Sequence, residues 1–199
     1  MGTGTAVWPG DQSFHLAWTL RRAAGDTVNV AALTLSPHTG THADGPFHYD
    51  DDGACPAELD LSAYLGPAHV VDATGRTTLD TDLIDGLDLI TAPRVLFRTR
   101  EHVQPGRFPT EFAPLTTELA EQLGLRGARL VGTDAPSVDA FDSKRLDVHR
   151  ILGRARIAIV ENLMLGDVVP GRYTLIALPL KLVDADSSPV RAVLVDDGP

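Results

Sequence analysis

Short apolar runs rich in Val, Ile, Leu and aromatic residues recur along the chain, and polar residues, glycines and prolines separate them. Runs of this length and composition are typical of β-strands. They lie at 14–20, 28–35, 68–73, 94–99, 128–133, 155–161, 173–180 and 191–195. We therefore expect a protein with a high content of β-sheet.

Three of the connecting segments carry helix signals. Thr78, Thr116 and Asp142 each stand at the start of a mixed polar and apolar stretch, and all three residue types cap helix N-termini. The middle stretch, ELAEQLGL, places Leu119 and Leu123 one helical turn apart. The alternation of strands and short helices favours an α/β fold over an all-β sandwich.

Length and charge narrow the class of protein. The 199 residues, 43% of them hydrophobic, are enough for one domain with a sizeable core, so we expect residues 1–199 to form a single domain. The formal charge of −10, without any block of Lys or Arg, argues against nucleic acid or an anionic membrane as partner. No apolar run approaches the ~20 residues of a spanning helix.

Cys55 is the single cysteine, so no internal disulfide can form. The first residues, MGTGTAVWPGDQ, lack the charged and apolar regions of a signal peptide, and we expect a cytoplasmic protein. Nothing in the sequence supplies a base for Cys55, which we interpret as an ordinary small side chain rather than a nucleophile.

The densest chemistry lies in SPHTGTHADGPFH, which carries His38, His42, Asp44 and His48. Their positions are all even, so an extended chain would project them to one face. A straight strand would separate the Cα atoms of His38 and His42 by about 13 Å, whereas ligand atoms lie about 2 Å from a bound ion. The chain must therefore bend, and the glycines and prolines of this stretch disfavour a helix.

Imidazole and carboxylate groups without a neighbouring thiolate favour zinc, manganese or iron. The alternative is a set of polar loop residues with one or two histidines hydrogen-bonded in the core. His15, His69 and His102 have no such context, and we interpret them as surface or packing residues.

His149 and Glu161 form a second place of interest. Glu161 ends the apolar strand IAIVE, where a buried carboxylate is costly unless it is paired or bound to metal. An exposed strand end with a solvated carboxylate is the alternative.

The pattern H-x-G-T-H-x-D-x-P-x-H over 38–48 resembles the signature of the metal-dependent cyclase-like hydrolase family. The resemblance extends to WPGD at 8–11, to GTDAPSVDAFDSKRLDVH at 132–149 and to ENLML at 161–165, and it points to the kynurenine formamidase (arylformamidase) branch. One departure lies at Ala140-Phe141, which is bulkier than the pair that the family carries there and bears on the shape of the substrate pocket.

The resemblance implies a swivelling β/β/α fold with a mixed sheet core and short flanking helices, and a site for two divalent ions, zinc or manganese. Of the candidate ligands, His149 would bind the second ion and Glu161 would bridge both. His48 would be the proton donor and acceptor, and Trp8 would lie against the substrate ring. His38, His42 and Asp44 would bind the first ion, and Asp44 would also reach the second.

The implied reaction is hydrolysis of N-formyl-L-kynurenine to L-kynurenine and formate by a homodimer, whose subunits could each contribute to the other's pocket. Two alternatives stay open. One is a related hydrolase acting on another cyclic or aryl amide, as isatin hydrolase does. The other is a non-catalytic metal-binding protein, since structural metal sites use the same ligand types.

Overall fold

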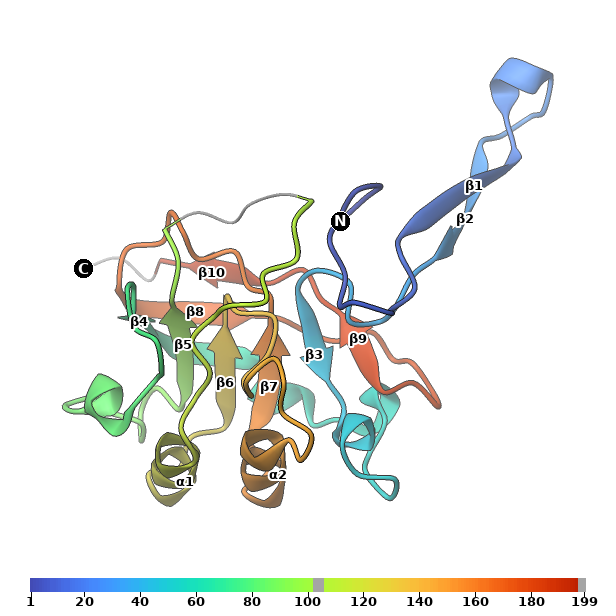
Figure 1. Ribbon diagram of the computed structural model, residues 1–199. Helices are drawn as coiled ribbons and strands as arrows, with labels where there is room; N and C mark the ends of the chain where they lie inside the picture. Colours follow the sequence, from blue (N-terminus) through green and yellow to red (C-terminus); the bar gives the residue numbers. More distant parts are fainter. Residues whose placement is uncertain (102–105, 197–199) are drawn as a thin grey trace.

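The computed structural model describes residues 1–101 and 106–196, which form a curled sheet, two helices and a projecting two-stranded arm (Figure 1). The strands are β1 (His15–Leu20), β2 (Val30–Thr34), β3 (His42–Asp44), β4 (Leu65–Asp72), β5 (Arg94–Arg98), β6 (Leu130–Thr133), β7 (Ala158–Glu161), β8 (Gly171–Ile176), β9 (Ser187–Pro189) and β10 (Val193–Val195). The helices are α1 (Thr117–Leu125) and α2 (Asp147–Arg154), and the 3-10 turns are η1 (Arg22–Ala24), η2 (Pro46–His48), η3 (Pro56–Glu58), η4 (Leu61–Ala63) and η5 (Thr81–Ile84).

The main sheet has eight strands in the order β10-β8-β4-β5-β6-β7-β3-β9. Its centre, β4 to β7, is parallel, and every pairing outside that centre is antiparallel. The predicted α/β fold with a mixed sheet is therefore confirmed. The apolar pattern predicts neither β3 nor β9, which are only three residues long and partly polar. Of the helices in the described part of the chain, none could cross a membrane.

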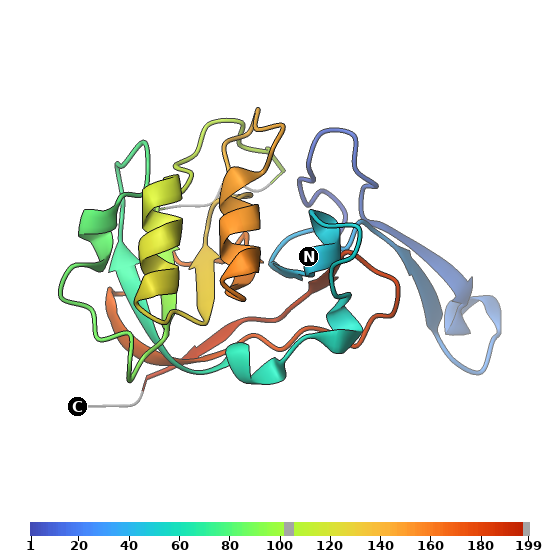
Figure 2. The same cartoon turned by 90° about the horizontal axis from the view of Figure 1, so that it is seen from below.

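Both helices cover the same face of the sheet and lie side by side (Figure 2). Leu119 and Leu123 of α1 and Leu152 of α2 are fully buried against Phe97 of β5. The predicted helical spacing of the two leucines is thus confirmed. So is the predicted cap, because the Thr116 side chain accepts a hydrogen bond from the backbone N–H of Leu119.

The other face of the sheet curls around a second apolar cluster. Leu96 of β5, Leu130 of β6, Val160 of β7 and Leu175 of β8 all point into it and are buried. Because alternate residues of a strand face opposite ways, Phe97 contributes to the helix side and Leu96 to this one. Parallel strands buried on both faces read as continuous apolar runs, which is why the sequence marks them well.

The helix predicted after Thr78 is wrong. Only the short turn η5 (Thr81–Ile84) forms there. Leu79 is held in an extended conformation, since its N–H donates to the carbonyl of Pro114 and its carbonyl accepts from the N–H of Thr116. These bonds to another segment commit the backbone that would have opened the helix.

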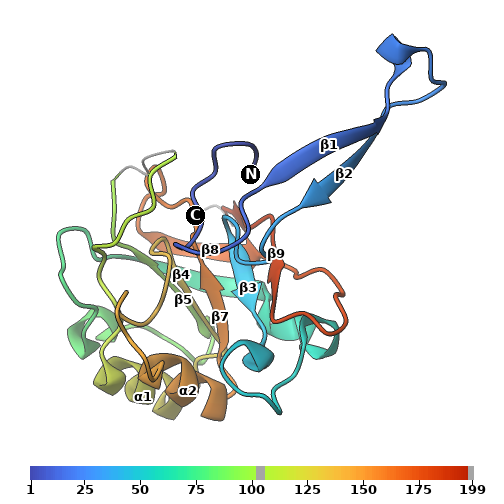
Figure 3. The same ribbon diagram turned by 45° about the vertical axis from the view of Figure 1, so that its right-hand side comes forward.

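Strands β1 and β2 do not join the main sheet. They pair with each other and project away from the body as an arm (Figures 1 and 3). Every residue of both strands is exposed. The body alone therefore provides the buried core, and the arm is available to other molecules.

Candidate metal centre

Strand β3 carries the first two candidate ligands into the sheet. His42 and Asp44 lie two positions apart on β3 and so face the same side, and both are buried. Strand β3 pairs with β7, and the register places His42 opposite Glu161. Glu161 is also buried, with 4% of its surface exposed, so the alternative of a solvated strand end is excluded.

A turn before β3 returns His38 to the same place. Gly40 has φ of +67°, the left-handed region that glycine adopts without strain. This bend brings Nδ1 of His38 to 3.2 Å from Oδ1 of Asp44. The bend predicted for this motif is confirmed, and so is the exclusion of a helix. The η2 turn then begins at Pro46, and it carries His48 at its end.

Helix α2 supplies His149 from the opposite side. Nε2 of His149 lies 3.5 Å from Oδ2 of Asp44 and 3.5 Å from Oε1 of Glu161. The cap signal predicts a helix start near Asp142, but the helix begins at Asp147. Leu146 precedes it with φ of +51°, in the left-handed region, and the side chain of Leu146 does not cap the helix.

Asp139 takes the place of the missing local cap. Its carboxylate accepts hydrogen bonds from the backbone N–H groups of Val148 and His149, and Oδ2 also lies 2.6 Å from the ring Nδ1 of His149. One acid therefore both caps α2 and fixes the ring. The sequence reading missed Asp139, whose only signal is its place in the segment SVDAF.

The three inner histidines share one arrangement. Each has one ring nitrogen held by an oxygen acceptor, which fixes the ring and its tautomer. The acceptors are Asp186 for Nε2 of His38 at 3.0 Å, the Gly40 carbonyl for Nδ1 of His42 at 2.8 Å, and Asp139 for Nδ1 of His149 at 2.6 Å. The remaining ring nitrogens all face Asp44 or Glu161.

These inward atoms lack hydrogen-bond partners. Among the described residues, nothing satisfies Nε2 of His42, Nε2 of His149 or either carboxylate oxygen of Asp44, although all four atoms are buried. Buried polar atoms without partners cost on the order of 1–3 kcal/mol each. Imidazole nitrogens and carboxylate oxygens that converge in this way are suited to hold divalent cations.

Possible ligand atoms form three groups, each with its atoms within 4.8 Å of one another. His38, His48 and Asp186 make a partly exposed group. The two inner groups are His38, His42 and Asp44, and Asp44, His149 and Glu161. Asp44 belongs to both inner groups. The structure therefore brings together all five residues predicted as ligands, while their roles stay predictions. The resemblance implies that Glu161 bridges both ions, but Glu161 falls only in the group with Asp44 and His149.

Without a cation, protons compensate the acids. Burial disfavours the charged form of His42, but Asp44 and Glu161 outweigh it and raise its pKa to about 10. Burial likewise opposes the charge of His38, but the neighbouring carboxylates of Asp186 and Asp44 raise its pKa to about 9. The histidines in turn keep the pKa of Asp44 well below its ordinary value, against the effect of burial. The pocket thus favours positive charge at its centre.

His48 lies at the exposed side of these ligands, and it belongs to neither of the two groups that contain Asp44. Its side chain is 32% exposed, and its ring centroid lies 4.3 Å from that of His38 and 5.9 Å from that of His149. Burial lowers the pKa of His48, mainly by disfavouring its charged form. A neutral imidazole open to solvent beside the ligands can accept a proton.

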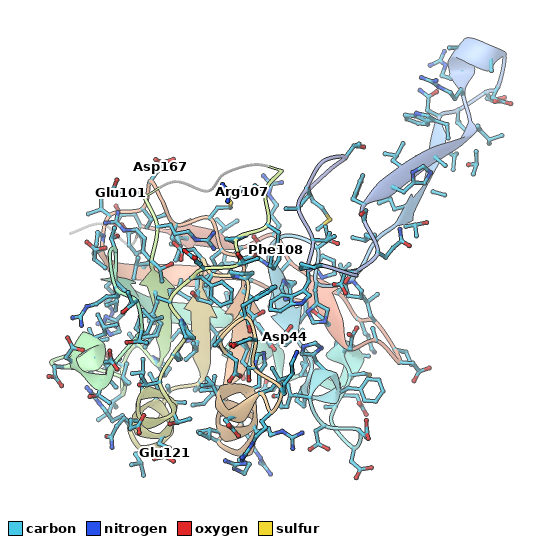
Figure 4. All side chains as sticks on the ribbon, viewed as in Figure 1. Asp44, Glu101, Arg107, Phe108, Glu121 and Asp167 are labelled. Carbon is cyan, nitrogen blue, oxygen red and sulfur yellow. The ribbon has the colours of Figure 1, made fainter. Side chains whose placement is uncertain are left out.

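Trp8 is half-buried and belongs to an aromatic cluster. Its ring centroid lies 5.2 Å from that of Phe108 and 5.0 Å from that of Phe141. Figure 4 labels Phe108 directly above Asp44, near the carboxyl ends of the parallel strands. The sequence reading missed Phe108, which has no motif around it, and noted Phe141 only as a departure from the family.

The other histidines lie apart from this centre. His15 is exposed on β1, and His69 is half-buried on β4, where its Nε2 lies 3.2 Å from the carbonyl of Asp88. His102 lies outside the described residues. A cavity of about 740 Å³ elsewhere in the body is lined by apolar residues such as Leu96 and Leu163 and by none of the predicted ligands.

Comparison with known proteins agrees with this geometry. The Cyclase family, described as "Putative cyclase", matches residues 1–140. The chain is 43% identical over 189 residues to the kynurenine formamidase of Bacillus mycoides (strain KBAB4), covering 95% of this chain and 90% of that one.

Solved structures give the same assignment. A potential metal-dependent hydrolase with cyclase activity superposes with a TM-score of 0.83 at 30% identity, covering 99% of this chain and 94% of that one. An isatin hydrolase bound to a product analogue superposes with a TM-score of 0.79 at 22% identity, covering 96% and 87%, and shares the fold. The chain therefore belongs to the cyclase family, in which its curated relatives include kynurenine formamidases.

Proposed function

We propose that this chain is a metal-dependent amidohydrolase that converts N-formyl-L-kynurenine and water to L-kynurenine and formate. The observation that carries the proposal is Asp44, a buried carboxylate whose two unsatisfied oxygens face two separate groups of ligand atoms. The kynurenine formamidases among the relatives supply the choice of substrate.

We infer that His38, His42 and Asp44 hold one divalent ion and that Asp44, His149 and Glu161 hold a second. Zinc and manganese both accept these ligands. When bound, such ions lower the pKa of a water molecule and polarise a carbonyl oxygen. The fit rests on the unsatisfied inner atoms and on the three rings, each of which is anchored through one nitrogen so that the other faces the buried carboxylates.

His48 is the group that we assign to proton transfer. Hydrolysis adds water to the formyl carbon, breaks the bond between that carbon and the aryl nitrogen, and needs a proton on the departing nitrogen. Burial lowers the pKa of His48 and so favours its neutral form, which can accept a proton from water and return it to the nitrogen. Its exposed position beside His38 leaves room for a substrate.

The aromatic cluster supports a binding place for the aryl ring. Trp8, Phe108 and Phe141 offer half-buried rings at distances typical of stacked and edge-to-face pairs. A flat aromatic amide could lie against them with its formyl group toward the ligands. Ring binding by Trp8 is the role that the resemblance implies, and Phe141 is the residue expected to alter the pocket's shape.

Two other functions use the same residues. A structural metal site usually has four protein ligands and no open position, whereas each group here offers three within the described residues. That difference favours catalysis over a purely structural role. A relative of the isatin hydrolases would share the fold and the ligands, and only its preferred substrate would distinguish it.

The arm supports a homodimer. Leu16 pairs with Leu33 and Trp18 pairs with Ala31, so one face of the arm is apolar, and Leu16, Trp18 and Leu33 are 39%, 47% and 58% exposed. A two-stranded ribbon is marginally stable alone in water, and an exposed apolar face of this kind marks an interaction surface. We propose that another protein surface covers it.

Charge favours a second copy of this chain as that surface. Residues 15–34 contain Arg21, Arg22 and Asp26 as their charged side chains, a net charge of +1, whereas the whole chain carries −10. The arm is thus a cationic element on an acidic protein, and it would be attracted to the body of another copy. We further propose that residues 1–199 act as one domain in the cytoplasm, where a chain with a single cysteine needs no disulfide.

The test removes metal with a chelator and follows hydrolysis of N-formyl-L-kynurenine and of isatin before and after zinc or manganese is restored. We expect metal-dependent turnover of N-formyl-L-kynurenine with kcat/KM above about 10⁴ M⁻¹s⁻¹. Faster turnover of isatin than of N-formyl-L-kynurenine would support an isatin hydrolase instead. Stoichiometric metal binding without hydrolysis of either compound would support the structural role.

A further inference from the structure

Asp186 reaches the metal centre from a distant part of the chain, and the sequence gives no hint of it. Its Oδ2 lies 3.0 Å from Nε2 of His38 and 3.7 Å from Nδ1 of His48. The carboxylate is 40% exposed, so it sits between the buried ligands and solvent. It is the only one of the three anchoring acceptors that also contacts the histidine assigned to proton transfer.

The backbone of Asp186 is fixed independently of its side chain. The carbonyl of Asp186 accepts a hydrogen bond of 2.8 Å from the N–H of Gly45, and the next residue, Ser187, pairs with Asp44 and donates from its hydroxyl to the carbonyl of Ala43. A side chain at Gly45 would place its Cβ 3.1 Å from the carbonyl oxygen of Asp186, so the two segments are in close contact. Strand β9 therefore holds this carboxylate at a set distance from the ligand motif.

The chemistry of the contact determines which nitrogen of His38 faces inward. An ionised carboxylate can only accept, so His38 donates from Nε2. In a neutral imidazole the other nitrogen then carries the lone pair, and Nδ1 is the atom that lies 3.2 Å from Asp44. Asp139 fixes His149 in the same way, but there Nδ1 contacts the anchoring acid and Nε2 faces Asp44.

We propose that Asp186 is a positioning residue that orients His38 for the first ion and holds His48 next to it. The carboxylate of Asp186 also lies within 4.8 Å of ligand atoms of His38 and His48, but it belongs to neither inner group. Its contact with His38 is on the nitrogen that points away from Asp44, so we assign it to positioning rather than to metal binding. This inference rests on the proposed metal centre but not on the identity of the substrate.

The test compares zinc binding by the wild type, Asp186→Ala, Asp186→Asn and Asp184→Asn, using competition with a chromophoric chelator at one pH. Loss of the acceptor in Asp186→Ala should weaken the first ion by about 10- to 100-fold and leave the number of bound ions unchanged. The amide oxygen in Asp186→Asn still accepts from Nε2, so most of the affinity should return. Asp184 is exposed and two residues away, and its variant removes the same charge without effect.

A double variant shows whether Asp186 acts through His38. In a His38→Ala background, adding Asp186→Ala should cause no further loss of zinc affinity. An additive loss would overturn the positioning role. So would wild-type affinity in Asp186→Ala, or a fall in the number of ions bound, which would make Asp186 a ligand. Failure of the wild type to bind zinc would instead overturn the metal centre itself, and this inference with it.

Discussion

Asp139 accepts hydrogen bonds from both the backbone N–H and the ring of His149, at 3.0 Å and 2.6 Å. A single carboxylate therefore fixes where helix α2 begins and how its ligand is oriented. Stability and metal binding are coupled at this residue, because the same side chain serves both.

Asp139→Ala should accordingly lose both properties. Removal of a helix cap costs about 0.5–2 kcal/mol of unfolding free energy, which denaturant unfolding of the metal-free protein would measure. The group that contains His149 should lose its affinity more than the group that contains His38. Asp142→Ala is the matched control, since Asp142 is exposed and lies outside the helix. Equal effects of the two variants would contradict the capping role.

Variants of His48 and Asp44 should differ in whether the loss of turnover is accompanied by a loss of bound metal. His48→Ala removes the proposed proton carrier but no ligand, so we expect it to retain both ions and to lose about 10²- to 10⁴-fold in kcat. Asp44→Ala removes the shared carboxylate, so we expect it to lose metal as well as turnover. Metal analysis and steady-state kinetics of both proteins give the answer. Normal activity in His48→Ala would remove that residue from the reaction.

Metal binding should depend on pH in a defined direction. The metal-free pKa values of about 9 for His38 and about 10 for His42 lie above the ordinary value of 6.5, so both rings are protonated at pH 7. A cation must displace those protons, and the apparent affinity for zinc should rise from pH 6.5 towards about 9. An indicator dye would detect the released protons, and zinc binding at pH 7 without proton release would contradict the expectation.

Stability of the metal-free protein should change in the opposite direction. A histidine whose pKa is raised in the folded state stabilises that state below the unfolded pKa of about 6.5. This contribution is lost as the pH rises through about 9 and 10, the folded values for His38 and His42. Thermal unfolding of the metal-free protein at pH 7 and at pH 10 would measure the loss, and a higher Tm at pH 10 would refute it.

The arm gives a prediction about assembly. Trp18→Asp combined with Leu33→Asp places two charges on its apolar face, and we expect sedimentation to show monomers. Ala17→Asp combined with Ala32→Asp adds the same charge to the opposite face, where the two alanines pair, and should leave the dimer intact. A monomeric wild type at micromolar concentration would exclude the proposed homodimer.

The sequence predicts the core of this fold better than the elements that carry the ligands, strand β3 and the start of helix α2. The spacing of Leu119 and Leu123 predicts α1, and the apolar runs predict the central strands. Strand β3 escapes that reading because its buried residues, His42 and Asp44, are ligand types rather than apolar ones. In the second helix, the start moves to Asp147 because its cap comes from a residue outside the local pattern.

The candidate ligands could be recognised because the histidine motif is dense and local. Their orientation could not, because the acids that fix His38 and His149 act across the fold and carry no spacing relationship to the rings. Asp186 lies more than a hundred residues from His38 along the chain, and only the pairing of β9 with β3 brings them together. Contacts of this kind depend on tertiary structure alone.

The place of β3 between β7 and β9 also has a consequence for biosynthesis. The inner ligands come from the first quarter and the last third of the chain, and the anchor of His38 lies near the carboxyl terminus. The ribosome must synthesise the chain past Asp186 before all of these groups can meet, and such long-range pairings form slowly. The group that contains His149 and Glu161, and the anchor of His38, are therefore completed only after the sheet closes, whereas His38, His42 and Asp44 come from one short segment made early.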